Sequence, residues 1–235
     1  MKNSLAASAN VDASPLVAAD IIERWQSEGP LVRFPTGIDP LDRLCRGGVP
    51  FPWRVLLVGA PSAGKTAIQT IIAQNLVQGG VCVGILAVDE EPEDVLVRLL
   101  QIAGFNLADV EAREPEMLEH MRASVEALRV RFYDATHTIE AASADLYAWA
   151  QQLGTRCALF IDSIQTAHSA ASTSDKNPRE HVEANVVAIR EAGSRYRMLT
   201  VATSEANRAS YRNDDAAATS NDLASGAESR AVEFS

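Results

Sequence analysis

The residues whose types and spacing point most directly to chemistry run from Gly59 to Thr66 and read Gly-Ala-Pro-Ser-Ala-Gly-Lys-Thr. This order matches G-x-x-x-x-G-K-[ST], the pattern of a loop that cradles phosphates. Its glycines let successive backbone N–H groups point inward at an anion, and the helix that follows adds its positive end. Lys65 can reach the β- and γ-phosphates, and the Thr66 hydroxyl can bind Mg²⁺. We therefore expect ATP and Mg²⁺ to be bound by Gly59, Ala60, Pro61, Ser62, Ala63, Gly64, Lys65, Thr66 and Ala67.

Two carboxylates follow apolar runs farther along the chain. The run 81–88 ends in Asp-Glu-Glu, which includes Glu90, and the run 157–161 ends in Asp162. A carboxylate just past a buried strand lies in the crevice where α/β sheets bind ligands. Paired with the phosphate loop, Asp162 fits the acid that holds Mg²⁺ through water while Thr66 binds the ion directly. The sequence therefore predicts a metal site at Thr66 and Asp162.

A strand, a turn and a helix must hold the phosphate loop in place. The apolar run 55–58 predicts a strand before the loop, and residues 67–76 after it have helical periodicity. Continuous apolar runs such as 81–88 are typical of parallel strands covered on both sides. The sequence therefore predicts an α/β fold, a mainly parallel sheet with helices on both faces. Further strands are expected at 129–134, 157–162 and 198–204, and further helices at 14–28, 39–44, 93–102, 107–128, 138–152 and 183–195.

The composition is that of a soluble globular chain. The 235 residues are 47% hydrophobic, enough for one sizeable core, and the net charge of −10 argues against a surface that coats nucleic acid. We expect an N-terminal extension at 1–30, disordered and then helical, followed by one domain at 31–235. The isolated Cys45, Cys82 and Cys157 form no zinc or disulfide pattern and fit a reducing cytoplasm. No apolar run reaches transmembrane length, so no membrane partner is expected.

A longer segment around the phosphate loop resembles a known family. TGIDPLDRLCRGGVPFPWRVLLVGAPSAGKT, residues 36–66, is similar to the entry of the RecA-like ATPase core in DnaB-type replicative helicases and KaiC/RadA-like ATPases. The resemblance continues in Ser-Ile-Gln at 163–165, in Ser-Glu-Ala-Asn-Arg at 204–208 and in Asp-Leu-Ala-Ser-Gly-Ala at 222–227. It covers about residues 36–235. It implies a RecA-like P-loop ATPase.

The resemblance also implies roles for individual side chains. Glu90 matches the glutamate that polarises the attacking water, and its neighbour Glu91 is the alternative. A third possibility is that residues 90–93 only favour the start of the next helix through its dipole. Lys65, with Mg²⁺, would neutralise charge on the γ-phosphate. Glu205 stands where the helicases have a glutamine that senses the γ-phosphate, and here the sequence departs from the family pattern.

Partners follow from the same resemblance. It implies a homo-oligomeric ring, such as a hexamer, with nucleotide at subunit interfaces. The loops 168–179 and 208–220 would face the central channel and single-stranded DNA, or would be plain surface loops. The families continue past Ser235 into another strand and an arginine-finger segment, so we expect a core that is incomplete at its C-terminal end. Arg208, Arg212 and Arg230 do not match the position of that arginine.

Three functions are compatible with these features. The first is a DNA-associated, helicase-like motor ATPase of DNA replication. The second is a KaiC/RadA-like ATPase in signalling or recombination, which the acidic net charge and the Glu90–Glu91 pair favour. The third is a nucleotide-dependent assembly module with little turnover. Stimulation of ATP hydrolysis by single-stranded DNA separates the first from the second, and measurable turnover separates both from the third.

Overall fold

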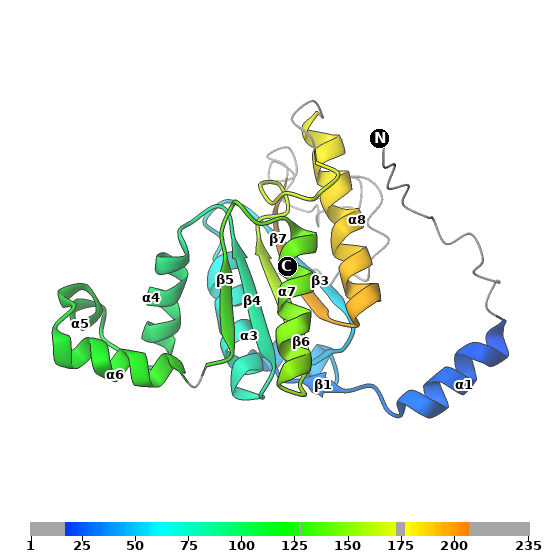
Figure 1. The fold of residues 1–235 in the computed structure, drawn as a ribbon, viewed down its shortest axis with the longest axis horizontal. Helices are drawn as coiled ribbons and strands as arrows, with labels where there is room; N and C mark the ends of the chain where they lie inside the picture. The colour runs from blue at the N-terminus through cyan, green and yellow to red at the C-terminus, as the bar shows by residue number, and fades with distance from the viewer. Residues whose placement is uncertain (1–16, 127, 173–176, 207–235) are drawn as a thin grey trace, which may run out of the picture. The chain divides into compact units, whose positions relative to one another are not determined.

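The computed structural model describes residues 17–126, 128–172 and 177–206. The chain divides into two units, residues 1–32 and 33–235. In the larger unit, the described residues form a five-stranded parallel sheet in the order β3-β7-β6-β4-β5 (Figure 1). The predicted α/β fold with a mainly parallel sheet is therefore confirmed. The expectation that the core lacks a strand after Ser235 is not tested by the described residues, which end at Ala206.

The strands of this sheet run in one direction, so their carboxyl ends meet at one edge. In sheet order they are β3 (Arg54–Gly59), β7 (Leu199–Glu205), β6 (Cys157–Asp162), β4 (Cys82–Ala87) and β5 (Val130–Tyr133). The register places Ala87 opposite Asp162 and Gly59 opposite Glu205. Asp162 and the strand end that leads to Glu90 therefore lie at the same edge of the sheet as the phosphate loop.

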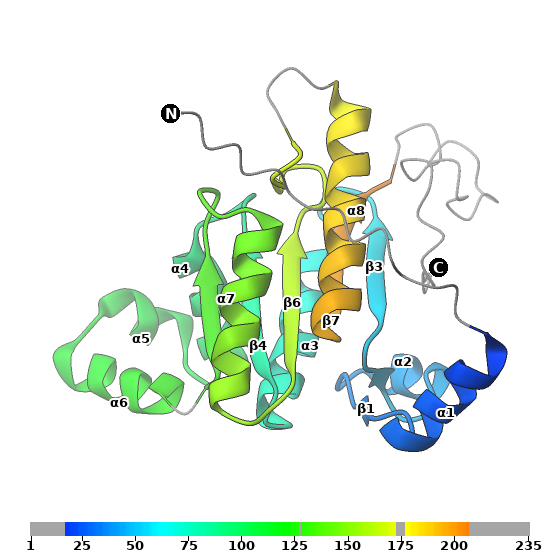
Figure 2. The same ribbon diagram turned by 45° about the vertical axis from the view of Figure 1, so that its right-hand side comes forward.

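Helices cover both faces of the sheet (Figures 1 and 2). α3 (Lys65–Gln78) and α4 (Pro92–Ile102) pack on one face, where their apolar residues join a core with β3 and β4. α7 (Ile139–Gln152) and α8 (Pro178–Tyr196) pack on the other face and form a second core with β6. Because both faces are covered, the strands can be apolar along their whole length, as the sequence showed.

The two helices of the second core begin at side-chain caps. Thr138 accepts a hydrogen bond from the Ala141 N–H at the start of α7, as the sequence predicted. The predicted start of the next helix at residue 183 is wrong, since α8 begins at Pro178. Asn177 accepts from the Glu180 N–H, and the Glu180 carboxylate accepts from the Asn177 N–H. This capping box and the proline at the first helical position explain the earlier start.

The predicted single helix over 107–128 is two helices. α5 (Leu107–Ala112) ends where Arg113 takes a left-handed backbone conformation with φ 51°, and α6 (Pro115–Glu126) begins two residues later. Proline disfavours a helical conformation in the residue before it, so the Glu-Pro step divides the two helices. Leu100 of α4, Val110 of α5 and Met121 of α6 form a small core of their own.

The segment that leads to β3 folds around one aspartate. Asp42 lies in α2 (Asp39–Leu44), and its carboxylate accepts hydrogen bonds from the Thr36 N–H and hydroxyl, both at 2.8 Å. This contact gives a structural reason for the threonine and the last aspartate of TGIDPLD, residues 36–42. Leu41 is buried, whereas Leu44, the last residue of the helix, is 65% exposed. β1 (Arg33–Phe34) and β2 (Val49–Pro50) pair antiparallel on either side of α2.

The smaller unit contains one described helix. α1 (Ala18–Glu28) begins after Val17, whose backbone is extended, so the start predicted at residue 14 is wrong. The Asp20 carboxylate accepts a hydrogen bond from the Val17 N–H at this start. The helix ends at Gly29, as predicted, and buries none of its residues. No helix in the described part of the chain combines the length and apolarity that crossing a membrane requires.

Candidate nucleotide site

The phosphate loop joins the carboxyl end of β3 to the first turn of α3. Ser62 and Gly64 have left-handed backbone conformations, with φ 61° and 86°, and α3 begins at Lys65. Such a turn directs consecutive N–H groups to one side of the chain, and the helix N-terminus adds its partial positive charge. The loop therefore has the backbone shape that receives the phosphates of a nucleotide.

The Lys65 ammonium group is folded over this loop. Its Nζ donates hydrogen bonds to the carbonyl oxygens of Gly59, at 3.2 Å, and Ala60, at 2.8 Å. Both acceptors are neutral and belong to the loop itself. A phosphate oxygen would be a stronger acceptor for this cation, because it carries a negative charge and a carbonyl oxygen does not.

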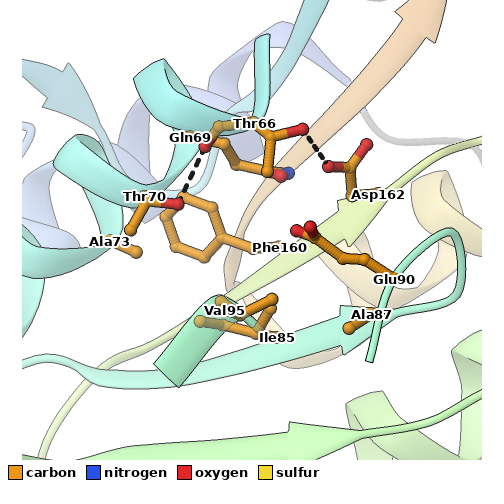
Figure 3. Close-up of a pocket in the computed structure, with 10 residues that line it drawn as sticks. All are labelled: Thr66, Gln69, Thr70, Ala73, Ile85, Ala87, Glu90, Val95, Phe160 and Asp162. Atoms are coloured by element: carbon orange, nitrogen blue, oxygen red, sulfur yellow. Dashed lines mark hydrogen bonds between the residues drawn. The ribbon is translucent and has the colours of Figure 1, made fainter. Parts of the chain in front are cut away.

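Two hydroxyl groups hold Asp162, the acid at the end of β6. The Thr66 Oγ1 donates to Asp162 Oδ2 at 2.6 Å (Figure 3), and the Thr203 Oγ1 donates to Asp162 Oδ1. Asp162 is 8% exposed and Thr203 is fully buried. Sequence reasoning missed Thr203. Its position near the end of an apolar strand was the available signal, but only the pairing of β7 with β6 shows that it reaches the acid.

These oxygen atoms suit a hard cation. In the described residues no group of three or more His, Cys, Asp and Glu side chains gathers as a metal site. One hydroxyl and one carboxylate are what Mg²⁺ uses when it keeps several waters and takes phosphate oxygens as further ligands. Thr66 and Asp162 therefore fit Mg²⁺ bound together with a nucleotide.

A buried glutamine fixes the position of α3 over the sheet. The Gln69 Nε2 donates to the carbonyl oxygens of Ile161 and Val201, both at 3.1 Å. One acceptor lies in β6 immediately before Asp162, and the other lies in β7. Gln69 follows Thr66 by about one helical turn, so these bonds hold the Thr66 hydroxyl over Asp162. Sequence reasoning missed this residue too, because a single glutamine in a helix carries no motif.

Glu90 lies in the same small cavity as Thr66 and Asp162. Ten residues from α3, α4, β4, β6 and the β4–α4 connection line this cavity, and Figure 3 shows the Glu90 side chain extending into it. The Glu90 side chain is 17% exposed, and its Oε1 accepts from Arg98 Nη1 at 2.5 Å. Glu91 is exposed at the N-cap of α4, where its carbonyl oxygen accepts from the Asp94 N–H. The geometry thus separates the two neighbouring acids.

The other residues predicted to contact nucleotide or DNA do not line this cavity, where they are described. Glu205 is exposed at the end of β7, where its backbone pairs with Gly59 and its carbonyl oxygen accepts from Gln165 Nε2 at 3.5 Å. Of the predicted channel loops, residues 173–176 and 208–220 lie outside the described residues. Arg179 lies in the first turn of α8 and forms an ion pair with Glu183 at 3.0 Å.

The family of the chain follows from a match over most of its length. A family model described as "ATPase: KaiC" matches residues 34–217. The chain belongs to this family. The circadian clock protein KaiC2 of Synechocystis sp. is 31% identical to this KaiC-type chain over 94 residues, which are 39% of the chain and 16% of KaiC2.

Solved structures agree on the fold of this KaiC-type chain. A DnaB-like replicative helicase, described with its interactions with primase, has a TM-score of 0.72 and 17% identity. The match covers 92% of the chain and 54% of the helicase chain. The ATPase domain of G40P has a TM-score of 0.72 and 18% identity, with 88% of the chain and 76% of that domain covered. The fold is therefore the RecA-like P-loop fold of helicase ATPase domains.

We expect the Thr203→Val variant to need more Mg²⁺ for ATP hydrolysis. The substitution keeps the shape of the side chain and removes the hydroxyl that holds Asp162 Oδ1. Partners that orient a metal-binding side chain typically contribute about 10-fold or more in affinity or activity. The Mg²⁺ concentration that half-saturates ATP hydrolysis should therefore rise about 10-fold.

Thr200→Val is the matched control, because the Thr200 hydroxyl lies buried in the same strand and has no hydrogen-bond partner in the described part of the structure. An equal shift in both variants, or no shift in Thr203→Val, would contradict the role assigned to Thr203.

Proposed function

We propose that this chain binds ATP with Mg²⁺ at the phosphate loop and hydrolyses it. The observation that carries the proposal is the contact between the Thr66 hydroxyl and Asp162 at 2.6 Å, beside a glutamate that lines the same cavity. P-loop ATPases need these parts together: a loop and lysine for phosphates, a hydroxyl and acid for the metal, and a carboxylate for water. The KaiC family match supports ATP as the nucleotide.

Each side chain has a role in the proposed reaction. Lys65 would leave the Gly59 and Ala60 carbonyls and bind β- and γ-phosphate oxygens. Thr66 and Asp162 would hold Mg²⁺, which supplies charge neutralisation on the phosphates. Glu90 would orient a water whose oxygen attacks the γ-phosphorus, while the bond to the β-phosphate oxygen breaks and ADP leaves. A carboxylate in hydrogen-bond reach can accept the proton that this water loses.

We further propose that the chain works as a homo-oligomeric ring in the cytoplasm. The family match and the likeness to helicase ATPase domains support assembly. Cys45, Cys82 and Cys157 are free and buried, as expected in a reducing compartment. Burial raises the pKa of the Cys157 thiol to about 12, with the neighbouring Cys82 adding to the shift, so this thiol stays protonated and unreactive.

A DNA-associated motor is the second candidate. The structural likeness to a DnaB-like replicative helicase favours it. Against it stand the net charge of −10 and the pairing of Arg179 with Glu183. Hydrolysis that does not depend on DNA, as in the KaiC/RadA-like alternative, is therefore our first choice.

Adding a single-stranded oligonucleotide is expected to change the ATPase rate by less than about two-fold, because the net charge of −10 disfavours binding of a phosphate backbone. Steady-state phosphate release with and without a poly-dT oligonucleotide measures this effect. A saturable stimulation of several-fold that falls with added salt would reverse the order of the two candidates.

A further inference from the structure

Arg98 is the cation nearest to the proposed water-positioning acid in the described part of the site. It lies in α4 one helical turn after Val95, and Val95 lines the cavity that contains Glu90. Residues three apart in a helix share a face, so the same face of α4 presents both side chains to the nucleotide site. Nothing in the sequence marked Arg98, because an arginine in a charged helix is ordinary.

The contact between Arg98 and Glu90 is close and partly shielded. Arg98 Nη1 donates to Glu90 Oε1 at 2.5 Å, with the two side chains 38% and 17% exposed. The bond to Glu90 raises the pKa of Arg98, and the carboxylates of Asp94 and Asp162 raise it further, although burial acts in the opposite direction. Arg98 therefore also lies within electrostatic reach of Asp162, the acid assigned to the metal.

The contact with Arg98 uses one of the two Glu90 carboxylate oxygens. Arg98 occupies Oε1, and Figure 3 shows the Glu90 carboxylate inside the cavity that Thr66 and Asp162 line. A glutamate side chain has three rotatable bonds, so without a tether its carboxylate samples many positions. Catalytic groups lose rate steeply when they are displaced by as little as about 1 Å.

We infer that Arg98 is a positioning residue, which holds Glu90 Oε1 so that Oε2 can orient the attacking water. The inference rests on the proposed function, since it gives Glu90 the role assigned there. The ordinary alternative is an ion pair that only supports the first turns of α4. Partly exposed pairs contribute little to stability, so that alternative predicts almost no change in catalysis.

Arg98→Met is expected to lower kcat for ATP by about 10-fold, while KM for ATP changes less than about two-fold, because Arg98 acts on the water and not on the phosphates. Arg98→Lys should recover most of the loss, since it restores a cation near Oε1. Arg122→Met is the matched control. It breaks an exposed Arg–Glu pair of 2.9 Å within α6 and should leave kcat unchanged. If Arg98→Met does not fold, Arg98→Gln carries the same test.

A double-mutant cycle with Glu90→Gln decides whether Arg98 acts through Glu90. Once the acid is gone, Arg98→Met should lower the residual rate by less than about two-fold, because interacting residues are not additive. A wild-type kcat in Arg98→Met beside an inactive Glu90→Gln would overturn this inference and leave the proposed function standing. So would an equal loss in both backgrounds. A fully active Glu90→Gln would instead overturn the role of Glu90 in the proposed function, and this inference with it.

Discussion

Glu90→Gln is expected to lower ATP turnover about 100-fold or more while ATP binding stays intact, since general-base catalysis contributes about 10²- to 10⁴-fold. Glutamine keeps the size of the side chain and can still accept a hydrogen bond from Arg98. It cannot accept the proton of the attacking water. Steady-state phosphate release measures turnover, and titration with a fluorescent ATP analogue measures binding in the same preparation.

Glu91→Gln is the natural control for this variant. Glu91 is adjacent in sequence but exposed at the N-cap of α4, and it does not line the cavity. Its loss should change turnover by less than about two-fold, the usual size of an effect away from the reacting groups. If Glu91→Gln is inactive and Glu90→Gln is active, the wrong carboxylate has been assigned to the water.

Lys65→Ala is expected to weaken ATP binding by about 10-fold or more. A charge-assisted hydrogen bond contributes about 1.5–3 kcal/mol, and Lys65 has the reach to contact both β- and γ-phosphates. Its present acceptors, the Gly59 and Ala60 carbonyls, lie within the loop that would receive those phosphates. Isothermal titration with ATP and Mg²⁺ gives the affinity directly.

Two controls show whether a loss of ATP binding comes from a general loss of positive charge or from misfolding. Arg122→Ala removes one exposed cation from α6, outside the nucleotide site, and should leave ATP affinity unchanged. A circular dichroism melting curve shows whether Lys65→Ala folds. A folded Lys65→Ala variant that binds ATP as tightly as the original chain would contradict the assignment of the phosphate loop.

The sequence predicted those parts of the structure that depend on a continuous stretch of residues. The loop from Gly59 to Thr66 and the apolar runs that end at Ala87 and Asp162 specify their own local structure. Parallel pairing then brings the strand ends to one edge, so the relative placement of these groups followed as well. The order of the strands did not follow. No local signal places β7 between β3 and β6.

Sequence reasoning missed three residues, and two of them, Thr203 and Gln69, act across long distances in the chain. Thr203 reaches Asp162 only because β7 pairs with β6. Gln69 reaches the carbonyls of two strands only because α3 lies across them. Arg98 is only eight residues from Glu90, but its contact depends on how the residues before α4 place the Glu90 side chain against that helix. Each contact depends on tertiary packing, which no motif or periodicity records.

The central claim is that this chain hydrolyses ATP at the phosphate loop, and single-turnover hydrolysis tests it most directly. The purified chain is incubated with γ-labelled ATP and then given Mg²⁺ at protein concentrations high enough for assembly. We predict that labelled phosphate is released in proportion to bound nucleotide, that release requires Mg²⁺, that Glu90→Gln slows it about 100-fold or more, and that Lys65→Ala lowers it by weakening ATP binding. Recovery of the bound ATP intact from the unmodified chain would contradict the claim and would identify a nucleotide-dependent assembly module instead.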